Sequence, residues 1–288
     1  MKDIFLIGFL CILATLKVTL QGFFAKKNVK TLPDAVFFNG IIFLFACLCF
    51  LKDAVGCSIA AIAFGAVFGI LTVAFQVIYM QAMSMGNVSL TVMLVNLSMI
   101  IPVVFSVVVF QETLTLLNGV GILLIFLALV ACTDKHSTTG GRTQNWFLCA
   151  LAASALNGAL AICLKIFGTT PFKAENRAFV AWAYLTAFTL SLLLYLVLKA
   201  NRKGKTFQTG WKPILIGAGA GITLAVFQTL NAWAVSRIHA AVFFPSYNGG
   251  SLILSTLSGV LLLKDKLKRT QLLAILLGIA AIVLLNVE

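Results

Sequence analysis

Acidic side chains are scarce in this sequence, and none of them lies in the middle of a long apolar segment. The chain of 288 residues has 8 Asp and Glu against 21 Lys and Arg. Each acid falls at the end of an apolar block or in a loop, at Asp3, Asp34, Asp53, Glu112, Asp134, Glu175, Asp265 and Glu288. This distribution argues against proton exchange through a carboxylate in the middle of a membrane. His136 and His239 also lie near block ends, where they are poorly placed to relay protons.

Signatures of catalysis and of metal binding are missing as well. The sequence has no HExxH zinc motif and no GxSxG nucleophile motif. Its 7 cysteines form no CxxC pair and are odd in number. They therefore fit small buried hydrophobic side chains better than a disulfide framework or a metal site. We expect no enzyme activity, no metal and no cofactor.

Charged residues of either sign make up 10% of the chain, against roughly 25% in typical soluble domains. Hydrophobic residues make up 61%, and the mean hydropathy is +1.08. Apolar residues run in blocks of about twenty, the length that crosses ~30 Å of hydrocarbon as a helix. These features indicate an integral membrane protein. The net charge of +13 fits cationic loops that face anionic lipid and the cytoplasm, and no nucleic-acid partner is expected.

Charges, prolines and polar clusters divide the chain into ten apolar segments. Backbone groups in lipid need partners within their own segment, so segments of this length are expected to be helices. The sequence predicts an all-α integral membrane protein with ten transmembrane helices. We place these helices at 4–25, 34–51, 56–82, 88–110, 114–132, 145–168, 175–199, 211–235, 240–263 and 268–287.

Several stretches occur twice along the chain. The sequence FLCILA at 9–14 is followed 138 positions later by FLCALA at 147–152. In a chain rich in Leu and Ala this match alone is weak. A second match joins GAVFGILTVAFQ at 65–76 to GAGAGITLAVFQ at 217–228, where six of twelve positions agree at an offset of 152. Two matches in the same order indicate an internal duplication.

Further matches extend the duplication to the ends of the two halves. Asn96 and Asn248 share the offset of 152, and ETL at 112–114 corresponds to DKL 153 positions later. The sequence therefore predicts a first five-helix repeat at 1–135 and a second at 136–288. Because five is odd, the second repeat is expected to be inverted in the membrane. Inverted repeats are the architecture of many secondary transporters, with the substrate site near the bilayer midplane.

The second match also carries a packing motif. Gly65 and Gly69 form a GxxxG pair, and Gly217 and Gly221 form another at the matching place. Such pairs let helix backbones approach closely. We expect them to pack the third and eighth helices against neighbours, and a direct part in a moving interface is the alternative.

The stretch from Asn96 to Val130, with LSMIIPVVFSVVVFQETLTLLNGVGILLIFLALV, resembles the EamA-type repeat of the drug/metabolite transporter (DMT) superfamily. The matching features are Pro102, Glu112, Leu114 and Gly121. The second half departs from this pattern, with Asp265, Leu254 and Ala274 at the positions of Glu112, Pro102 and Gly121. The resemblance implies ten helices, two inverted halves and transport of a small molecule, and it specifies no substrate.

Lys17 is the charge nearest the centre of an apolar segment. A lysine there costs about 2.5–3.5 kcal/mol on insertion scales. Gln21 lies on the same helix face, and Ala155 occupies the Lys17 position of the second repeat. Lys17 is a candidate to attract a carboxylate or phosphate, and snorkelling toward the interface is the alternative. Lys165 aligns with Lys27 near a helix end, where snorkelling is the simpler interpretation.

Polar pairs occur at matching places in the third and eighth helices. Gln76 and Tyr79 are three residues apart, as are Gln228 and Asn231, so each pair shares a helix face. We interpret them as part of a central site, and hydrogen bonding between helices, typically worth about 0.6 kcal/mol, is the alternative.

Other candidates come from the ninth helix, where Pro245 and Gly249–Gly250 weaken helicity. Trp182 and Trp233 are either anchors at the membrane interface or walls of an aromatic pocket. Such a pocket would bind a quaternary amine by cation–π attraction. A quaternary amine in the site competes with the interpretation that Lys17 binds an anion. The expected substrate-binding residues are Lys17, Gln21, Gln76, Tyr79, Asn96, Asn157, Trp182, Tyr184, Gln228, Asn231, Trp233, Tyr247, Asn248 and Ser251.

The distribution of the basic residues between the two ends of the helices predicts the orientation of the chain in the membrane. Outside Lys17 and Lys165, fourteen lie on the side of the loops after the odd-numbered helices and five on the side of the termini. The positive-inside rule places the fourteen in the cytoplasm and both termini outside. Several EamA-type relatives are drawn with cytoplasmic termini, so the resemblance implies the opposite orientation.

The function expected from the sequence is a secondary transporter in the cell membrane. It moves a small polar or amphiphilic metabolite, such as an amino acid, a nucleoside or a quaternary amine, by alternating access. Its partners are the substrate and the lipid bilayer, and it acts as a monomer or homodimer. The alternative is a membrane subunit of an assembly that flips lipid-linked substrates.

Overall fold

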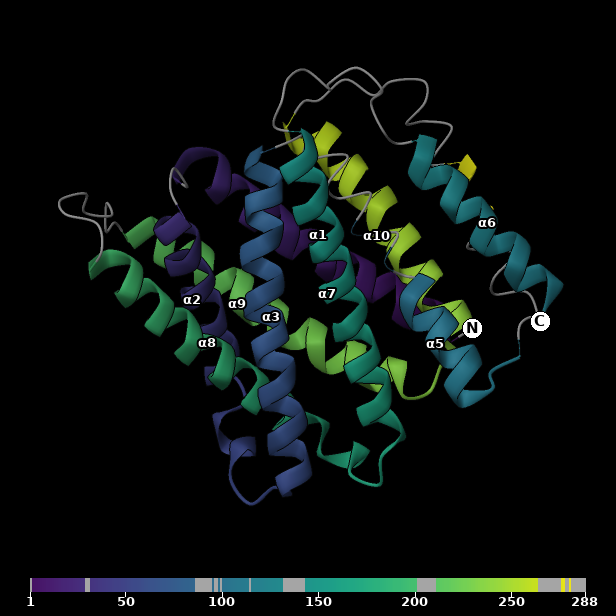
Figure 1. Cartoon of the computed structure of the whole chain (residues 1–288), viewed down its shortest axis with the longest axis horizontal. Helices are drawn as coiled ribbons and strands as arrows, with labels where there is room; N and C mark the ends of the chain where they lie inside the picture. Colours follow the sequence, from purple (N-terminus) through teal and green to yellow (C-terminus); the bar gives the residue numbers. More distant parts are fainter. Residues whose placement is uncertain are drawn as a thin grey trace.

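The computed structural model describes the chain apart from residue 1 and residues 29–31, 86–94, 96–97, 99, 114, 132–142, 201–210, 264–275, 278–279 and 281–288. The described residues contain nine α-helices, two short 3-10 helices and no strand (Figure 1). The helices are α1 (Lys2–Asn28), α2 (Leu32–Leu48), α3 (Ile59–Met85), α5 (Ile100–Phe110), α6 (Leu116–Ala131), α7 (Thr143–Thr169), α8 (Asn176–Ala200), α9 (Trp211–Val235) and α10 (Ala240–Leu263), with η1 (Leu51–Ala54) and η2 (Lys173–Glu175).

The expected segments and the observed helices agree closely where both can be compared. The segments 211–235 and 240–263 match α9 and α10 at both ends. α2 differs, since it begins at Leu32 and ends at Leu48, before the 3-10 turn η1. Pro33 fits the first turn of a helix because its missing N–H has no partner there in any case. Most of the expected segment 268–287 and the start of 88–110 lie outside the described residues.

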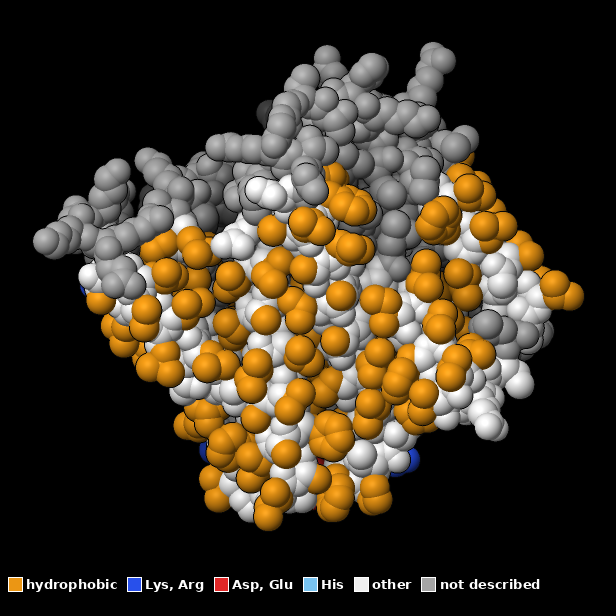
Figure 2. Space-filling view, viewed as in Figure 1, with side chains coloured by type: hydrophobic (Ala, Val, Ile, Leu, Met, Phe, Trp, Pro, Cys, Tyr) orange, Lys and Arg blue, Asp and Glu red, His pale blue; other side chains and the backbone are white. Residues whose placement is uncertain are grey.

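Within the described part, five helical stretches are long and apolar enough to cross a membrane: Asp3–Leu20, Ile59–Tyr79, Asn145–Thr169, Lys173–Ala200 and Pro213–Val235. Leu32–Leu48 and Ile100–Phe110 are shorter apolar helices. The visible surface is mostly hydrophobic, and the basic side chains on it lie near its edges (Figure 2). An apolar belt of this kind suits lipid and not water. The protein is a multi-pass membrane protein.

The helices of the two halves of the chain make contacts in matching pairs. α3 packs against α7 and α8, and α9 packs in the same way against α1 and α2. α5 contacts α7, and α10 contacts α1. α2 and α8 also pack against each other. Each half therefore packs its third helix onto the first two helices of the other half.

The glycines of the GxxxG pairs lie directly on neighbouring backbones. A Cβ added at Gly69 would meet the carbonyl oxygen of Ala183 and lie 2.9 Å from Thr186 Cβ. A Cβ added at Gly221 would lie 2.5 Å from the carbonyl oxygen of Ile42 and 2.8 Å from Phe45 Cβ. Only glycine fits such a close approach. The packing interpretation of these glycines is what the structure shows.

The two glycine contacts are equivalent in detail. On α8 the contacted residues are Ala183 and Thr186, and on α2 they are Ile42 and Phe45. Each residue on α8 lies 141 positions after its counterpart on α2. The same local contact is thus built twice, between α3 and α8 and between α9 and α2.

Candidate functional site

Gln76 on α3 and Gln228 on α9 both lie inside the bundle. Their side chains are 8% and 5% exposed. The amide nitrogen Nε2 of Gln228 is buried and has no hydrogen-bond partner among the described residues. A buried donor without a partner costs about 1–3 kcal/mol, so its retention inside a folded chain calls for a functional explanation. The two matched glutamines are therefore the centre of the candidate site.

Lys17 lies on the inward face of α1. Leu10 and Ala14, seven and three residues earlier, are 0% and 8% exposed, and this spacing puts all three on one helix face. The side chain of Lys17 is half-buried, and no ion pair joins it to a described carboxylate. This placement favours the cation inside the bundle over snorkelling along the lipid face. The side chain of Gln21 lies outside the described residues.

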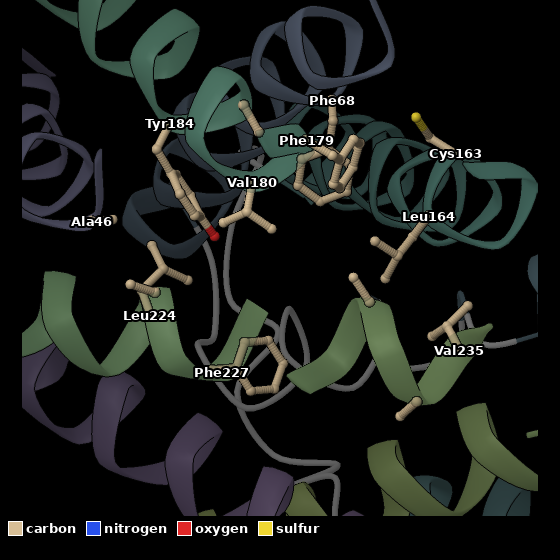
Figure 3. Close-up of a cluster of buried hydrophobic side chains, with 14 of the residues drawn as sticks. Ala46, Phe68, Cys163, Leu164, Phe179, Val180, Tyr184, Leu224, Phe227 and Val235 are labelled. Carbon is tan, nitrogen blue, oxygen red and sulfur yellow. The ribbon is translucent and has the colours of Figure 1, made fainter. Parts of the chain in front are cut away.

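Two tyrosines line the same interior. Tyr184 on α8 is 2% exposed and points toward Leu224 of α9 (Figure 3). Tyr247 on α10 stacks on Phe243 with ring centroids 6.0 Å apart and lies 5.7 Å from the ring of Phe227 on α9. Both tyrosines offer a phenol hydroxyl on an apolar body, which suits a polar or amphiphilic ligand.

The second pair of matched polar residues is less buried. Tyr79 is half-buried on α3 and stacks on Phe75 with centroids 5.3 Å apart. Asn231 is half-buried on α9. The structure thus places Tyr79 and Asn231 one turn beyond the two glutamines, on the same two helices. Asn96, also expected in the site, lies outside the described residues.

Three other expected site residues use their side chains in structural hydrogen bonds. Asn157 Nδ2 donates to Ser98 Oγ at 2.7 Å, which joins α7 to the segment before α5. Asn248 Nδ2 donates to the Phe244 carbonyl at 2.8 Å, and Ser251 Oγ donates to the Asn248 carbonyl at 3.0 Å, both within α10. α10 continues as a helix through Pro245. Asn248 and Ser251 thus stabilise their own helix in this state.

Of the two interpretations of Trp182 and Trp233, their contacts favour interface anchors over the walls of an aromatic pocket. Trp182 Nε1 donates to the Ala54 carbonyl at 3.1 Å, so the indole ties α8 to η1. Trp233 is 42% exposed, and the guanidinium of Arg237 lies 4.4 Å from its ring centroid near the end of α9. Both are anchors of the kind found at membrane interfaces. We leave them out of the proposed site.

The expectation that Lys165 snorkels is also corrected. Its Nζ lies 2.7 Å from Glu112 Oε1, and the two side chains are 8% and 11% exposed. The same ammonium donates to the Ile238 carbonyl at 3.3 Å. A buried ion pair with an additional hydrogen bond compensates for much of the desolvation of both charges. Lys165 is therefore held inside the bundle end and does not face lipid.

Glu112 also holds the start of α10. Its Oε2 accepts a hydrogen bond from the Ala240 N–H at 2.8 Å and lies 3.9 Å from His239 Nδ1. A carboxylate at a helix N-terminus is favoured by the exposed N–H groups and by the helix dipole. Gln111, with φ of 54°, turns the chain after α5 and brings Glu112 back to the bundle. Glu112 thus joins the α5–α6 loop, α7 and α10.

Further polar contacts tie the same end of the bundle. Ser58 donates both its N–H and its hydroxyl to Glu175 Oε2 at 2.8 Å, at the start of α3. Asn176 Nδ2 donates to the Thr229 carbonyl at 2.9 Å, and Arg177 pairs with Asp53 at 3.2 Å. Among the described residues no group of three His, Cys, Asp or Glu side chains could hold a metal ion.

Comparison with known proteins gives one family and one fold. Residues 5–133 match the model of the EamA-like transporter family, which confirms the resemblance expected from the sequence. A solved structure titled "Crystal structure of protein" is similar over 99% of this chain and 98% of its own, with a TM-score of 0.78 and 14% identity. At that identity the likeness shows the fold alone. None of the curated proteins matches this sequence.

Proposed function

We propose that this chain, which matches the EamA-like transporter family over residues 5–133, is a secondary transporter of the DMT type that works by alternating access. The observation that carries the proposal is the duplicated close contact, Gly69 on the α8 backbone and Gly221 on the α2 backbone. Two halves that pack by the same contact can exchange conformations at nearly equal energy.

The proposal includes ten helices in two inverted halves, 1–135 and 136–288. It is supported by the matching pairs of helix contacts and by the constant offsets between the contacted residues. It is also supported by the span-length helices in both halves.

The proposed site lies between the halves, where α3 contributes Gln76, α9 contributes Gln228, and α1 contributes Lys17. Tyr184 and Tyr247 add hydroxyls and aromatic faces. Amide, hydroxyl, ammonium and aromatic groups together suit a small polar or amphiphilic metabolite, of the amino acid, nucleoside or quaternary amine class.

The mechanism requires the bundle end around Glu112 to open and close. In the present state Glu112 links α7 and α10 to the α5–α6 loop. Opening on this side would separate these contacts while the opposite side closes. The buried ion pair then acts as a reversible closure for one end of the path.

The test is solute flux by the purified protein in proteoliposomes, screened with radiolabelled amino acids, nucleosides and choline. We expect flux of at least one class, and at least a tenfold loss in Gln76→Leu and in Gln228→Leu. Thr189→Val is the matched control, since Thr189 is exposed on α8 and bonds only its own helix.

Normal flux in both glutamine variants would remove them from the site, and no flux of any probe would sink the transporter proposal. Flux by the chain alone would also count against the alternative of a subunit that needs a flippase assembly.

A further inference from the structure

We propose that the parts that rock against each other are not the sequence halves 1–135 and 136–288, but two bodies that each take helices from both halves. The first body consists of α1, α2, α9 and α10, and the second of α3, α5, α7 and α8. The inference rests on the proposed transport function and names the parts that move in it.

Apart from the contact of α2 with α8, the extensive helix contacts lie within these two bodies. In the first body α1 packs against α9 and α10, and α2 packs against α9. In the second body α3 packs against α7 and α8, and α5 packs against α7. Gly221 of α9 lies on the α2 backbone, and Gly69 of α3 lies on the α8 backbone. Because backbones packed this closely cannot slide without a clash, each body is expected to move as a unit.

Two contacts between the bodies join repeat counterparts. α2 touches its counterpart α8 on the left of Figure 1, and α5 touches its counterpart α10 on the right. Phe43 and Tyr184 are 141 positions apart, like the other counterparts on α2 and α8, and their rings stack with centroids 6.1 Å apart. A contact between counterparts is transformed into itself when the two halves exchange conformations. The α2–α8 and α5–α10 contacts therefore persist in both states and serve as pivots.

Another contact between the bodies is formed at one end only. Near the end of α7, an added Cβ at Gly168 would be 2.7 Å from Cβ of Ser236, which follows α9. Lys165 Nζ donates to the Ile238 carbonyl beside it at 3.3 Å. The equivalent contact would join α1 to α3, and in the described part of the chain these helices make no contact comparable with that of α7 and α9. In this state the bodies are thus closed together at the end that holds Glu112.

Exchange of conformations between the halves moves this closure to the opposite end. The counterpart of Lys165 is Lys27 on α1, at the offset of 138, and the counterpart of Ser236 is Ser84 on α3, at the offset of 152. Closing the opposite end brings α1 toward the end of α3, while α7 separates from α9. Both helices of each closing pair belong to one sequence half, so the motion takes place within each half.

Two disulfides distinguish the swapped bodies from the sequence halves. Gly168→Cys/Ser236→Cys links the two bodies within one sequence half. Thr19→Cys/Ser258→Cys links the two sequence halves within the first body, where the two hydroxyl oxygens lie 3.4 Å apart. Both pairs are close enough for a disulfide, whose Cβ atoms are about 3.5–4.5 Å apart. Each pair is made in a background without native cysteines, and flux of a transported amino acid, nucleoside or choline is measured before and after oxidation.

We expect oxidation of Gly168→Cys/Ser236→Cys to lower flux at least tenfold, and reduction with dithiothreitol to restore it. Oxidation of Thr19→Cys/Ser258→Cys should leave flux within twofold. The single-cysteine variants are the controls, and loss of maleimide labelling verifies each disulfide. The reverse pattern would show that the sequence halves are the moving bodies and would overturn the inference. Loss of flux with both disulfides, or with neither, would overturn it as well.

Distances between spin labels test the same motion without a transported substrate and without the packed glycine. Phe172 follows α7 and Arg237 follows α9, so labels at these two positions report on both bodies within one sequence half. Ile59 begins α3, so labels at Ile59 and Phe172 report on both sequence halves within the second body. All three side chains are exposed. In reconstituted protein, double electron–electron resonance should give two distances for Phe172→Cys/Arg237→Cys and one for Ile59→Cys/Phe172→Cys.

Any other pattern of distances would overturn the swapped bodies. If one probe is transported all the same, the transporter proposal stands without them. The expected distances with no flux of any probe would support the swapped bodies and remove the transporter proposal.

Discussion

The two halves of the chain share their packing and differ in one half-buried charge, Lys17. Gly69 and Gly221 are 152 positions apart in the sequence, and they make equivalent contacts with the backbones of α8 and α2. Lys17, on the inward face of α1, has Ala155 as its counterpart on α7, and Ala155 is exposed. The duplicated glycines build the frame, while the charge that only one half contains is a candidate for contact with a substrate.

The second buried lysine follows the same rule. Lys165 recurs in the first half as Lys27, and its partner Glu112 recurs in the second half as Asp265. The pair present in the structure, Lys165 with Glu112, is buried and compensated. A duplicated, paired lysine is structural, while Lys17, which is not duplicated and has no ion-pair partner in the described part of the chain, is the candidate for ligand binding.

The largest expected effect comes from breaking the structural pair. Glu112→Ala leaves the ammonium of Lys165 buried without a carboxylate and removes the acceptor for Ala240 N–H. We expect a loss of about 3–5 kcal/mol in stability. The midpoint of thermal unfolding, followed by fluorescence-detected size-exclusion chromatography in detergent, measures it.

Asp53→Ala is the control, because Asp53 pairs with Arg177 at the surface, where such pairs contribute about 0–1 kcal/mol. The double variant Glu112→Ala/Lys165→Met should recover part of the loss, since it removes the buried charge. Equal losses in Glu112→Ala and Asp53→Ala would contradict the structural role of the buried pair.

The duplicated glycines are expected to matter equally. Gly69→Ala and Gly221→Ala each push a methyl group against a backbone carbonyl, of Ala183 and of Ile42. We expect each to lower stability by about 1–3 kcal/mol. The same unfolding midpoint measures both.

Gly8→Ala on α1 is the matched control, since an added Cβ there meets nothing within 4 Å. It should be neutral or slightly stabilising, because alanine favours the helix. A large loss of stability in only one of the two glycine variants would contradict the equivalence of the halves.

The helices could be predicted from the sequence, but the ion pair could not. Apolar blocks cut by charges gave the bounds of α9 and α10 because lipid forces each block to be a continuous helix. Lys165 and Glu112 are 53 positions apart, and no local pattern tells which loop returns to which helix. The hydrogen bond of Trp182 could not be predicted for the same reason, since its acceptor, the Ala54 carbonyl, belongs to a distant 3-10 turn. The sequence left Lys17 between an inward position and snorkelling, and only the burial of Leu10 and Ala14 on its helix face favours the inward position.

A smaller effect on stability is expected at Trp182. A substitution there tests whether the indole is a structural anchor or a contact to the ligand. Trp182→Phe removes the hydrogen bond to the Ala54 carbonyl and keeps the aromatic bulk. Stability should fall by about 0.5–1.5 kcal/mol, the usual net value of one hydrogen bond. Flux in proteoliposomes should stay within twofold of wild type. A flux loss of tenfold at unchanged stability would return Trp182 to the site.

The smallest effect on stability tests whether the duplicated glutamines are equivalent. Gln228→Leu removes a buried amide nitrogen for which the described residues offer no hydrogen-bond partner, so we expect a gain in stability of up to about 1 kcal/mol. Gln76 has no orphaned buried atom, and Gln76→Leu should change the unfolding midpoint less. Both variants should nevertheless lose flux. If Gln228→Leu destabilises the protein while flux persists, the amide serves packing between helices, and Gln228 leaves the proposed site.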